Sequence, residues 1–217
     1  MFFFPMGCLL FTLFMLAMPF LFLLMYLNIA TFSLEKLGIS SEIGLLILFI
    51  TLIGSFINIP LTKRTVQYSR NIRLGGFTVP VLHESGLAIN LGGAIIPVAI
   101  SLYLLVRFPT WQILLATLFM IIICKFLTKP VPGRGLAISM FIPPLFAAAF
   151  AIVLAREFAP ACAYISGVLG TLIGGDILNI RKIWGTNSGI ISIGGAGVFD
   201  GIFLVGIVSV ILAAFFG

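Results

Sequence analysis

Residues 167–209 read GVLGTLIGGDILNI, RKIWGTNSG and IISIGGAGVFDGIFLVGIVS, so a short polar, basic turn joins two apolar segments. Each apolar segment holds one aspartate among glycines, Asp176 in the first and Asp200 in the second. They are the only two of the six acidic residues that lie well inside apolar runs. A carboxylate in hydrocarbon costs at least about 2.5–3.5 kcal/mol, so it marks a functional site by default.

The composition sets the solvent in which these aspartates must be understood. Hydrophobic residues make up 61% of the 217 residues and charged residues 8%. A soluble domain cannot hide that much apolar surface, so we predict an all-α integral membrane protein whose main partner is the lipid bilayer. The net charge is +6, and the basic residues that cause it lie between the apolar segments. It indicates membrane topology and contact with anionic lipid, not nucleic-acid binding.

We predict a single transmembrane domain over residues 1–217 with about seven helices, some kinked or broken by Gly and Pro. The expected spans are about 6–31, 43–61, 86–106, 110–128, 136–155, 160–180 and 190–216. The apolar start lacks a basic leader and a cleavage site, so we interpret it as the first span and not a signal peptide. Nine of the twelve Lys and Arg residues fall in loops two, four and six. We expect the protein in the cell (inner) membrane. The positive-inside rule then places its N-terminus in the cytoplasm and its C-terminus on the outer side of that membrane.

Loop two is the longest and has two interpretations. Apolar residues alternate on both sides of Gly75-Gly76, which predicts a short cytoplasmic β-hairpin whose free edge could pair with an extended partner chain. The alternative is a basic amphipathic loop lying on the lipid surface.

Glycine and proline interrupt the third and fifth spans. INLGGAIIP (89–97) contains Asn90 within the third span, and Pro143-Pro144 lies in the fifth. These breaks indicate either simple kinks or discontinuous helices lining a substrate path. INLGGAIIPVAI (89–100) also resembles ISIGGAGVFDGI (191–202), as a duplicated transporter half would, although the flanking residues do not align.

Small residues predict close packing around the two aspartates. Ser166, Gly170 and Gly174 form a small-xxx-small ridge in the sixth span, and Gly197 and Gly201 repeat the spacing in the seventh. A loop of about eight residues makes the two spans antiparallel neighbours. Close packing would then bring Asp176 and Asp200 within reach of each other.

Three roles are open for this pair. Two carboxylates sharing a low-dielectric site do not both ionise easily and share a proton, which suits acid/base activation of water against a peptide bond. The same pair suits proton or cation coupling in a transporter. The third role is structural, with Lys125 as the charge partner of one aspartate. The three cysteines (Cys8, Cys124, Cys162) and the single His83 show no metal spacing, so we expect no metal and no cofactor.

The segment GAGVFDGIFLVG (195–206) resembles the GxGD segment of presenilin and signal peptide peptidase, which are intramembrane aspartyl proteases. Phe199 stands where that motif has its second glycine. The resemblance implies a presenilin-like helical core, with Asp176 and Asp200 as the catalytic pair facing the cytoplasm. The segment around Asp176 is also similar to prepilin peptidases. Through GGDILN and GGAGVFDGIF, the chain resembles an uncharacterised prokaryotic family of polytopic membrane proteins.

The leading hypothesis from the sequence is therefore an intramembrane aspartyl protease acting on a transmembrane peptide substrate. Asp176 and Asp200 would share the acid and base roles. The residues expected to shape the site are Asn179, Gly195, Gly197, Gly201 and Asn90. A small ion-coupled transporter and a non-enzymatic membrane scaffold are the alternatives. The oligomeric state stays open.

Overall fold

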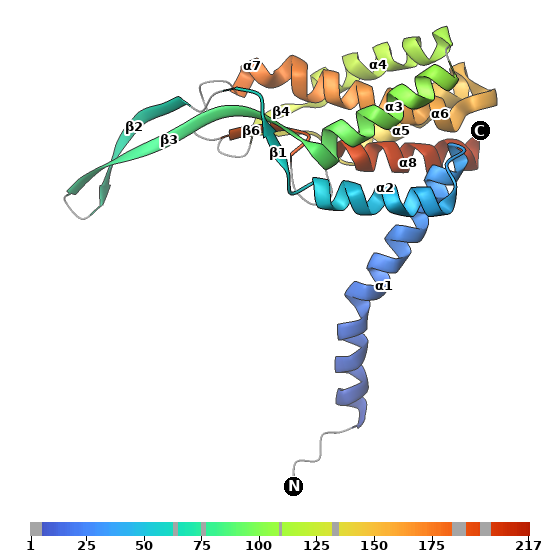
Figure 1. The fold of residues 1–217 in the computed structure, drawn as a ribbon, viewed down its shortest axis with the longest axis horizontal. Coiled ribbons are helices and arrows are strands. Elements are labelled where there is room, and N and C mark those ends of the chain that lie inside the picture. Colours follow the sequence, from blue (N-terminus) through green and yellow to red (C-terminus); the bar gives the residue numbers. More distant parts are fainter. Residues whose placement is uncertain are drawn as a thin grey trace.

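The computed structural model describes residues 6–62, 65–74, 77–108, 110–131, 135–183, 190–195 and 201–217. Within them the chain is mostly helical, as predicted (Figure 1). The helices are α1 (Met6–Lys36), α2 (Ser41–Gly54), η1 (Leu91–Ile95), α3 (Ile96–Arg107), α4 (Trp111–Leu127), α5 (Ile142–Leu154), η2 (Arg156–Phe158), α6 (Ala159–Gly170), η3 (Thr171–Asp176), η4 (Ile177–Asn179), α7 (Ile180–Ile183) and α8 (Gly201–Phe216). The strands are β1 (Asn58–Pro60), β2 (Thr65–Leu74), β3 (Phe77–Asn90), β4 (Lys129–Val131), β5 (Gly135–Ala137) and β6 (Ile190–Ile193).

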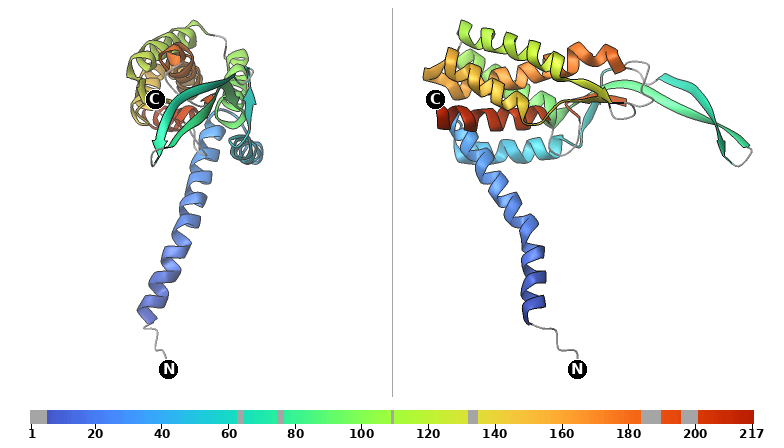
Figure 2. Two further views of the ribbon diagram at one scale, coloured as in Figure 1. Left: turned by 90° about the vertical axis from the view of Figure 1, so that its left-hand side faces the viewer. Right: turned by 180° about the vertical axis from the view of Figure 1, so that it is seen from behind.

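After α1 the chain runs to one end of the bundle and back three times, along α2 and α3, α4 and α5, and α6 and α8. In the last two cases the two helices pack on each other, whereas α2 packs on α1 and η1. The β-strands that the structure describes all lie at the turns between these helices, and the turns gather at that end of the bundle (Figures 1 and 2). We call this end, which carries β1, β3, β4, β5 and β6, the sheet end. Loops two, four and six of the sequence therefore meet there. The C-terminus lies at the opposite end.

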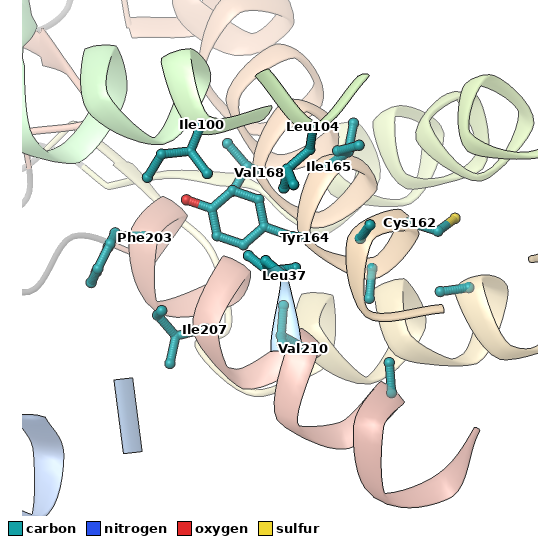
Figure 3. Close-up of a cluster of buried hydrophobic side chains, with 14 of the residues drawn as sticks. Leu37, Ile100, Leu104, Cys162, Tyr164, Ile165, Val168, Phe203, Ile207 and Val210 are labelled. Carbon is teal, nitrogen blue, oxygen red and sulfur yellow. The ribbon is translucent and has the colours of Figure 1, made fainter. Parts of the chain in front are cut away.

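The helix α6 forms the centre of the bundle. All of its residues from 161 to 168 are buried. Figure 3 shows the Tyr164 ring of α6 among Ile100 and Leu104 of α3 and Phe203 and Ile207 of α8. A run of side chains buried on every face means that neighbouring helices surround α6, which explains why it carries no polar face.

Small residues on α6 and α8 allow the helices to approach closely, as the sequence predicted. A Cβ atom at Gly206 would lie 2.8 Å from the Tyr164 ring, and Gly167 faces Val205 and Ser209. Residues later in α8 contact residues earlier in α6, so the two helices are antiparallel. However, the ridge residues Gly170 and Gly174 pack against Met120 and Ile121 of α4, not against α8.

Four expected helical ranges differ at the sheet end. The range 43–61 stops being helical at Gly54 and contains β1, and 86–106 begins as β3. The range 136–155 begins in β5 and becomes helical only at Ile142, and 190–216 begins as β6. Strands β1, β2, β3 and β6 belong to one sheet, in which β3 pairs with β1 antiparallel and with β6 in parallel, while β4 and β5 form a separate antiparallel pair. The helix after β3 begins only at Leu91 because Asn90 has extended backbone angles and its side chain accepts the Gly93 N–H, as an N-cap residue does.

The hairpin predicted in loop two is present and longer than expected. β2 pairs antiparallel with β3 from Thr65 opposite Ser85 to Leu74 opposite Phe77, with a register shift between Ser69 and Ile72. The predicted turn residues Gly75 and Gly76 lie outside the described residues. The hairpin projects away from the sheet end, roughly in line with the long axis of the bundle (Figure 1).

Two described helical stretches are long and apolar enough to cross a membrane, Phe14–Lys36 and Arg156–Lys182. The first is almost wholly exposed, because only the end of α1 packs on the bundle and the rest runs away from it (Figure 2). The second is mostly buried and contains α6. The other apolar helices span 10–17 residues each.

Replacing Gly174 by Ala tests the close packing of η3 on α4. The new Cβ would overlap the Ile121 carbonyl group, so we expect the free energy of unfolding to fall by about 1–3 kcal/mol. Gly201→Ala is the matched control, because a Cβ there meets no described atom within 4 Å. Thermal unfolding of both variants in detergent measures the difference, and equal stability would contradict the packing.

Candidate functional site

Asp176 lies where the long central helix is broken. The α-helical hydrogen-bond pattern of α6 changes to a π-helix over Thr171–Asp176, then to a 3-10 turn over Ile177–Asn179, before α7. The π-helix contains Gly174 and Gly175. Single π-helical turns within helices occur frequently at functional sites. The break places Asp176 at the sheet end, with a side chain that is only partly exposed.

The Asp176 carboxylate binds the backbone of the segment that leads to Asp200. The Gly194 N–H donates a hydrogen bond of 3.0 Å to Asp176 Oδ2. Among the described residues no donor engages the other oxygen, Oδ1. One oxygen of the carboxylate is thus held in place by the Gly194 backbone.

Gly194 connects Asp176 to the start of η1. Its φ of +67° is in the left-handed region that favours glycine. A Cβ at this position would also lie 2.8 Å from Ala94 Cβ and 2.9 Å from the carbonyl carbon of Gly93. Glycine is therefore needed at position 194 both for its backbone conformation and for space.

The two similar sequence segments around INLGGA and ISIGGA lie side by side. β3 and β6 run in parallel, with Ile89 opposite Ile193, and both strands lead through a double glycine toward a helix, α3 or α8. The pairing is shifted by two residues from the sequence alignment, which matches Ile89 with Ile191. Gly195 follows directly, is exposed, and donates its N–H to the Ser192 carbonyl at 3.3 Å.

The buried Asn179 stabilises the helix break. Its Nδ2 donates to the carbonyl oxygens of Gly174 at 2.8 Å, Gly175 at 3.1 Å and Lys125 at 3.2 Å. These bonds satisfy carbonyl groups near the irregular turns and tie the break to the end of α4. The Lys125 side chain itself is exposed, and the contact that the structure shows between Lys125 and Asn179 is through the lysine backbone.

Asn90 has a comparable structural position in the other break. Its Oδ1 accepts the Gly93 N–H at 2.7 Å, and its Nδ2 donates to the Ser55 carbonyl at 2.7 Å and to Asn58 Oδ1 at 3.1 Å. Asn58 Oδ1 also accepts the Ser192 hydroxyl at 2.6 Å. Asn90 therefore joins the end of α2, β1 and η1, and through Asn58 it reaches β6.

The structure brings together some of the predicted site residues and leaves others untested. Asp176, Asn179, Gly195 and Asn90 all lie at the sheet end. Asp200 and Gly197 lie outside the described residues, so the distance between the two aspartates stays a prediction. Gly201 is the first residue of α8, and the close packing predicted for it is not found among the described atoms.

Sequence reasoning left two neighbours of Asp176 out of the predicted site. Gly194 was recognisable only as part of a glycine-rich run, since a positive φ cannot be assigned to one of several adjacent glycines. Cys124 lies close to Thr171, with 3.6 Å between Sγ and Oγ1, on the α4 side of the π-helix. Among the residues that the structure describes, no three His, Cys, Asp or Glu residues form a group that could hold a metal ion.

Residues 52–212 match the model of a family described as "Protein of unknown function (DUF1614)". The match covers well over half of the chain, so the protein belongs to this family. It includes both glycine-rich breaks and both aspartates, and it excludes α1 and most of α2. No curated protein and no solved structure matches the chain.

Replacing Asn179 tests whether this side chain holds the break. Asn179→Ala leaves three carbonyl groups without their donor, and Asn179→Asp keeps the size of the side chain but removes both N–H groups. We expect each variant to lose about 1–3 kcal/mol of stability and to exchange the amide hydrogens of 171–183 faster. Ser192→Ala, which removes one hydrogen bond at the same end, should stay within about 0.5 kcal/mol. Unchanged exchange in both Asn179 variants would refute this role.

Proposed function

We propose that this protein is a multi-pass membrane protein whose described helices cross the bilayer as a bundle, with α1 as an additional apolar helix. Large apolar side chains are exposed along α1, α2, α4 and α5, as lipid contact requires. Loops two, four and six meet at the sheet end, and these loops hold most of the basic residues. The positive-inside rule then puts the sheet end in the cytoplasm.

Cysteine labelling tests this orientation. In a variant without Cys8, Cys124 and Cys162, Ser40→Cys marks the exposed connection between α1 and α2, and Ser69→Cys marks β2 in the hairpin. A membrane-impermeant maleimide should label Ser40→Cys in whole cells, and Ser69→Cys only after the membrane is permeabilised. The reverse pattern, or equal labelling of both, would exclude the orientation.

We further propose that Asp176 and Asp200 form a site that hydrolyses a peptide bond of a membrane-embedded substrate. The observation that carries this proposal is the hydrogen bond from Gly194 to Asp176. It attaches one aspartate to the start of the GGAGVFD segment (194–200), in which the second aspartate lies. The antiparallel packing of α6 and α8 supports the same neighbourhood, and so does the resemblance of this segment to the GxGD motif.

The chemistry follows from two carboxyl groups that share one proton. The ionised group accepts a proton from a water molecule, whose oxygen attacks the peptide carbonyl carbon, while the protonated group donates to the carbonyl oxygen. Collapse of this intermediate breaks the C–N bond and passes a proton to the leaving amine. In this proposal Asp176 Oδ1 would face the water, because the Gly194 N–H engages Oδ2 and no described donor engages Oδ1.

Cleavage assays on single variants test the catalytic pair. Purified protein in lipid vesicles is mixed with membrane-spanning peptides bearing a fluorophore and a quencher. Asp176→Asn and Asp200→Asn should each reduce cleavage at least about 100-fold, since each removes one of the two proton-transfer groups. Glu157→Gln is the matched control, because Glu157 is an exposed acid in η2 and should leave cleavage unchanged. Cleavage that persists in both aspartate variants would refute the proposal.

A second candidate function is ion-coupled transport, favoured by the parallel pairing of β3 and β6. Each strand precedes a double glycine and a helix, and such paired discontinuities line substrate sites in many transporters. The same variants separate the two functions in sealed vesicles. A transporter moves protons or another cation down a gradient in an Asp176-dependent manner without cleaving any peptide, whereas a protease cleaves without net flux.

A further inference from the structure

The hairpin of β2 and β3 is attached to the bundle only at its base. Residues 86–90 of β3 lie between β1 and β6, and they form the anchored part. The nine residues 77–85 pair only with β2 among the described strands. At about 3.3 Å per residue this outer part extends about 30 Å, and it points away from the bundle (Figure 1).

The outer part has the backbone of a docking strand. No described strand pairs with the outer edge of β2, whose N–H and C=O groups are a template for a further strand. An isolated two-stranded ribbon is at best marginally stable in water, so a third strand would stabilise it. The other edge is less suitable, because Pro80 of β3, at the register shift, has no N–H to donate.

The charge of this stretch selects the partner. Residues 63–90 contain four bases, Lys63, Arg64, Arg70 and Arg73, and a single acid, Glu84. A second copy of the hairpin would carry the same positive charge, so like-charge repulsion opposes self-pairing. The hairpin continues the long axis of the bundle, so helices that cross the bilayer would hold it away from the headgroups of their own membrane.

We infer that β2 is a docking strand for an extended acidic segment of a cytoplasmic protein, which adds to the outer edge of the hairpin. Main-chain hydrogen bonds along residues 65–74 would supply affinity, and Arg70 and Arg73 would select an acidic chain. This surface is separate from Asp176 and requires no catalysis. It rests only on the proposed orientation of the sheet end, which the labelling experiment tests independently.

Peptide binding to the full chain in neutral-lipid nanodiscs tests this inference. The probe is a fluorescent ten-residue peptide that alternates Glu with Val, compared with a Lys–Val peptide of equal length by fluorescence anisotropy. We expect the Glu–Val peptide to bind at least about tenfold more tightly. The same peptide N-methylated at every residue keeps its charge but cannot donate backbone hydrogen bonds, so it should lose binding. Equal binding of the methylated peptide would overturn strand addition.

Variants and competitors locate the surface. Arg70→Glu combined with Arg73→Glu should weaken peptide binding at least about tenfold, whereas Arg70→Lys with Arg73→Lys should stay within about threefold. Hydrogen exchange of residues 65–74 should slow when the peptide is added, and circular dichroism checks that the variants keep their helices. Tighter binding of the protein to phosphatidylglycerol vesicles or to an oligonucleotide than to the peptide would overturn the inference. A dimer of the full chain that is lost in the variant with Arg70→Glu and Arg73→Glu would also overturn it.

Discussion

The hydrogen bond between the Gly194 N–H and the Asp176 carboxylate joins two parts of the chain that are separated by 18 residues and by a change of direction. Three double glycines lie at this end of the bundle. Gly174 and Gly175 lie in the π-helix η3, Gly92 and Gly93 lie in η1, and Gly194 and Gly195 directly follow β6. A side chain at Gly194 would collide with Ala94, and one at Gly92 would collide with the end of α2. The site therefore depends on close contacts between backbone segments at Gly92 and Gly194, and any side chain at these two positions would prevent them.

The two asparagines explain how such irregular backbone is tolerated in an apolar interior. Buried carbonyl and N–H groups without partners cost free energy comparable to a lost hydrogen bond. Asn179 supplies donors to the carbonyl groups beside the π-helix, and Asn90 supplies both an acceptor and donors at η1. Each break thus has its own amide side chain in place of regular helical hydrogen bonds. The breaks persist because these amides replace interactions that a continuous helix would make by itself.

The parts of the fold that depend on local pattern could be predicted from the sequence. Small residues at helical spacing predicted the close approach of α6 to its neighbours, and the short turn predicted that α6 and α8 are antiparallel. Glycines between alternating apolar residues predicted the hairpin. Strands β1 and β6, the base of β3 and the end of β5 were predicted as helix, because a short apolar run has the same composition in either state and only pairing with another strand decides. The preference of Gly170 and Gly174 for α4 was likewise invisible, since a small-residue ridge does not name its partner. The two aspartates could be singled out by their rarity in apolar runs, but the contact between Asp176 and Gly194 needed the structure.

The distribution of hydrogen bonds separates structural from chemical polar residues at this end of the bundle. Asn179 and Asn90 direct their Nδ2 groups to backbone and side-chain oxygens, and Asn90 Oδ1 also accepts an N–H. The Asn90 amide and the Asn179 Nδ2 group are committed to the fold, whereas no described donor reaches the buried Asn179 Oδ1. Asp176 accepts the Gly194 N–H with Oδ2, and no described donor engages its Oδ1. A carboxyl group in this state can exchange a proton without breaking the contact that positions it, because the hydrogen bond and the proton are on different oxygens. This difference supports the proposal that the aspartates carry the chemistry, while the asparagines and glycines hold the backbone of the sheet end in place.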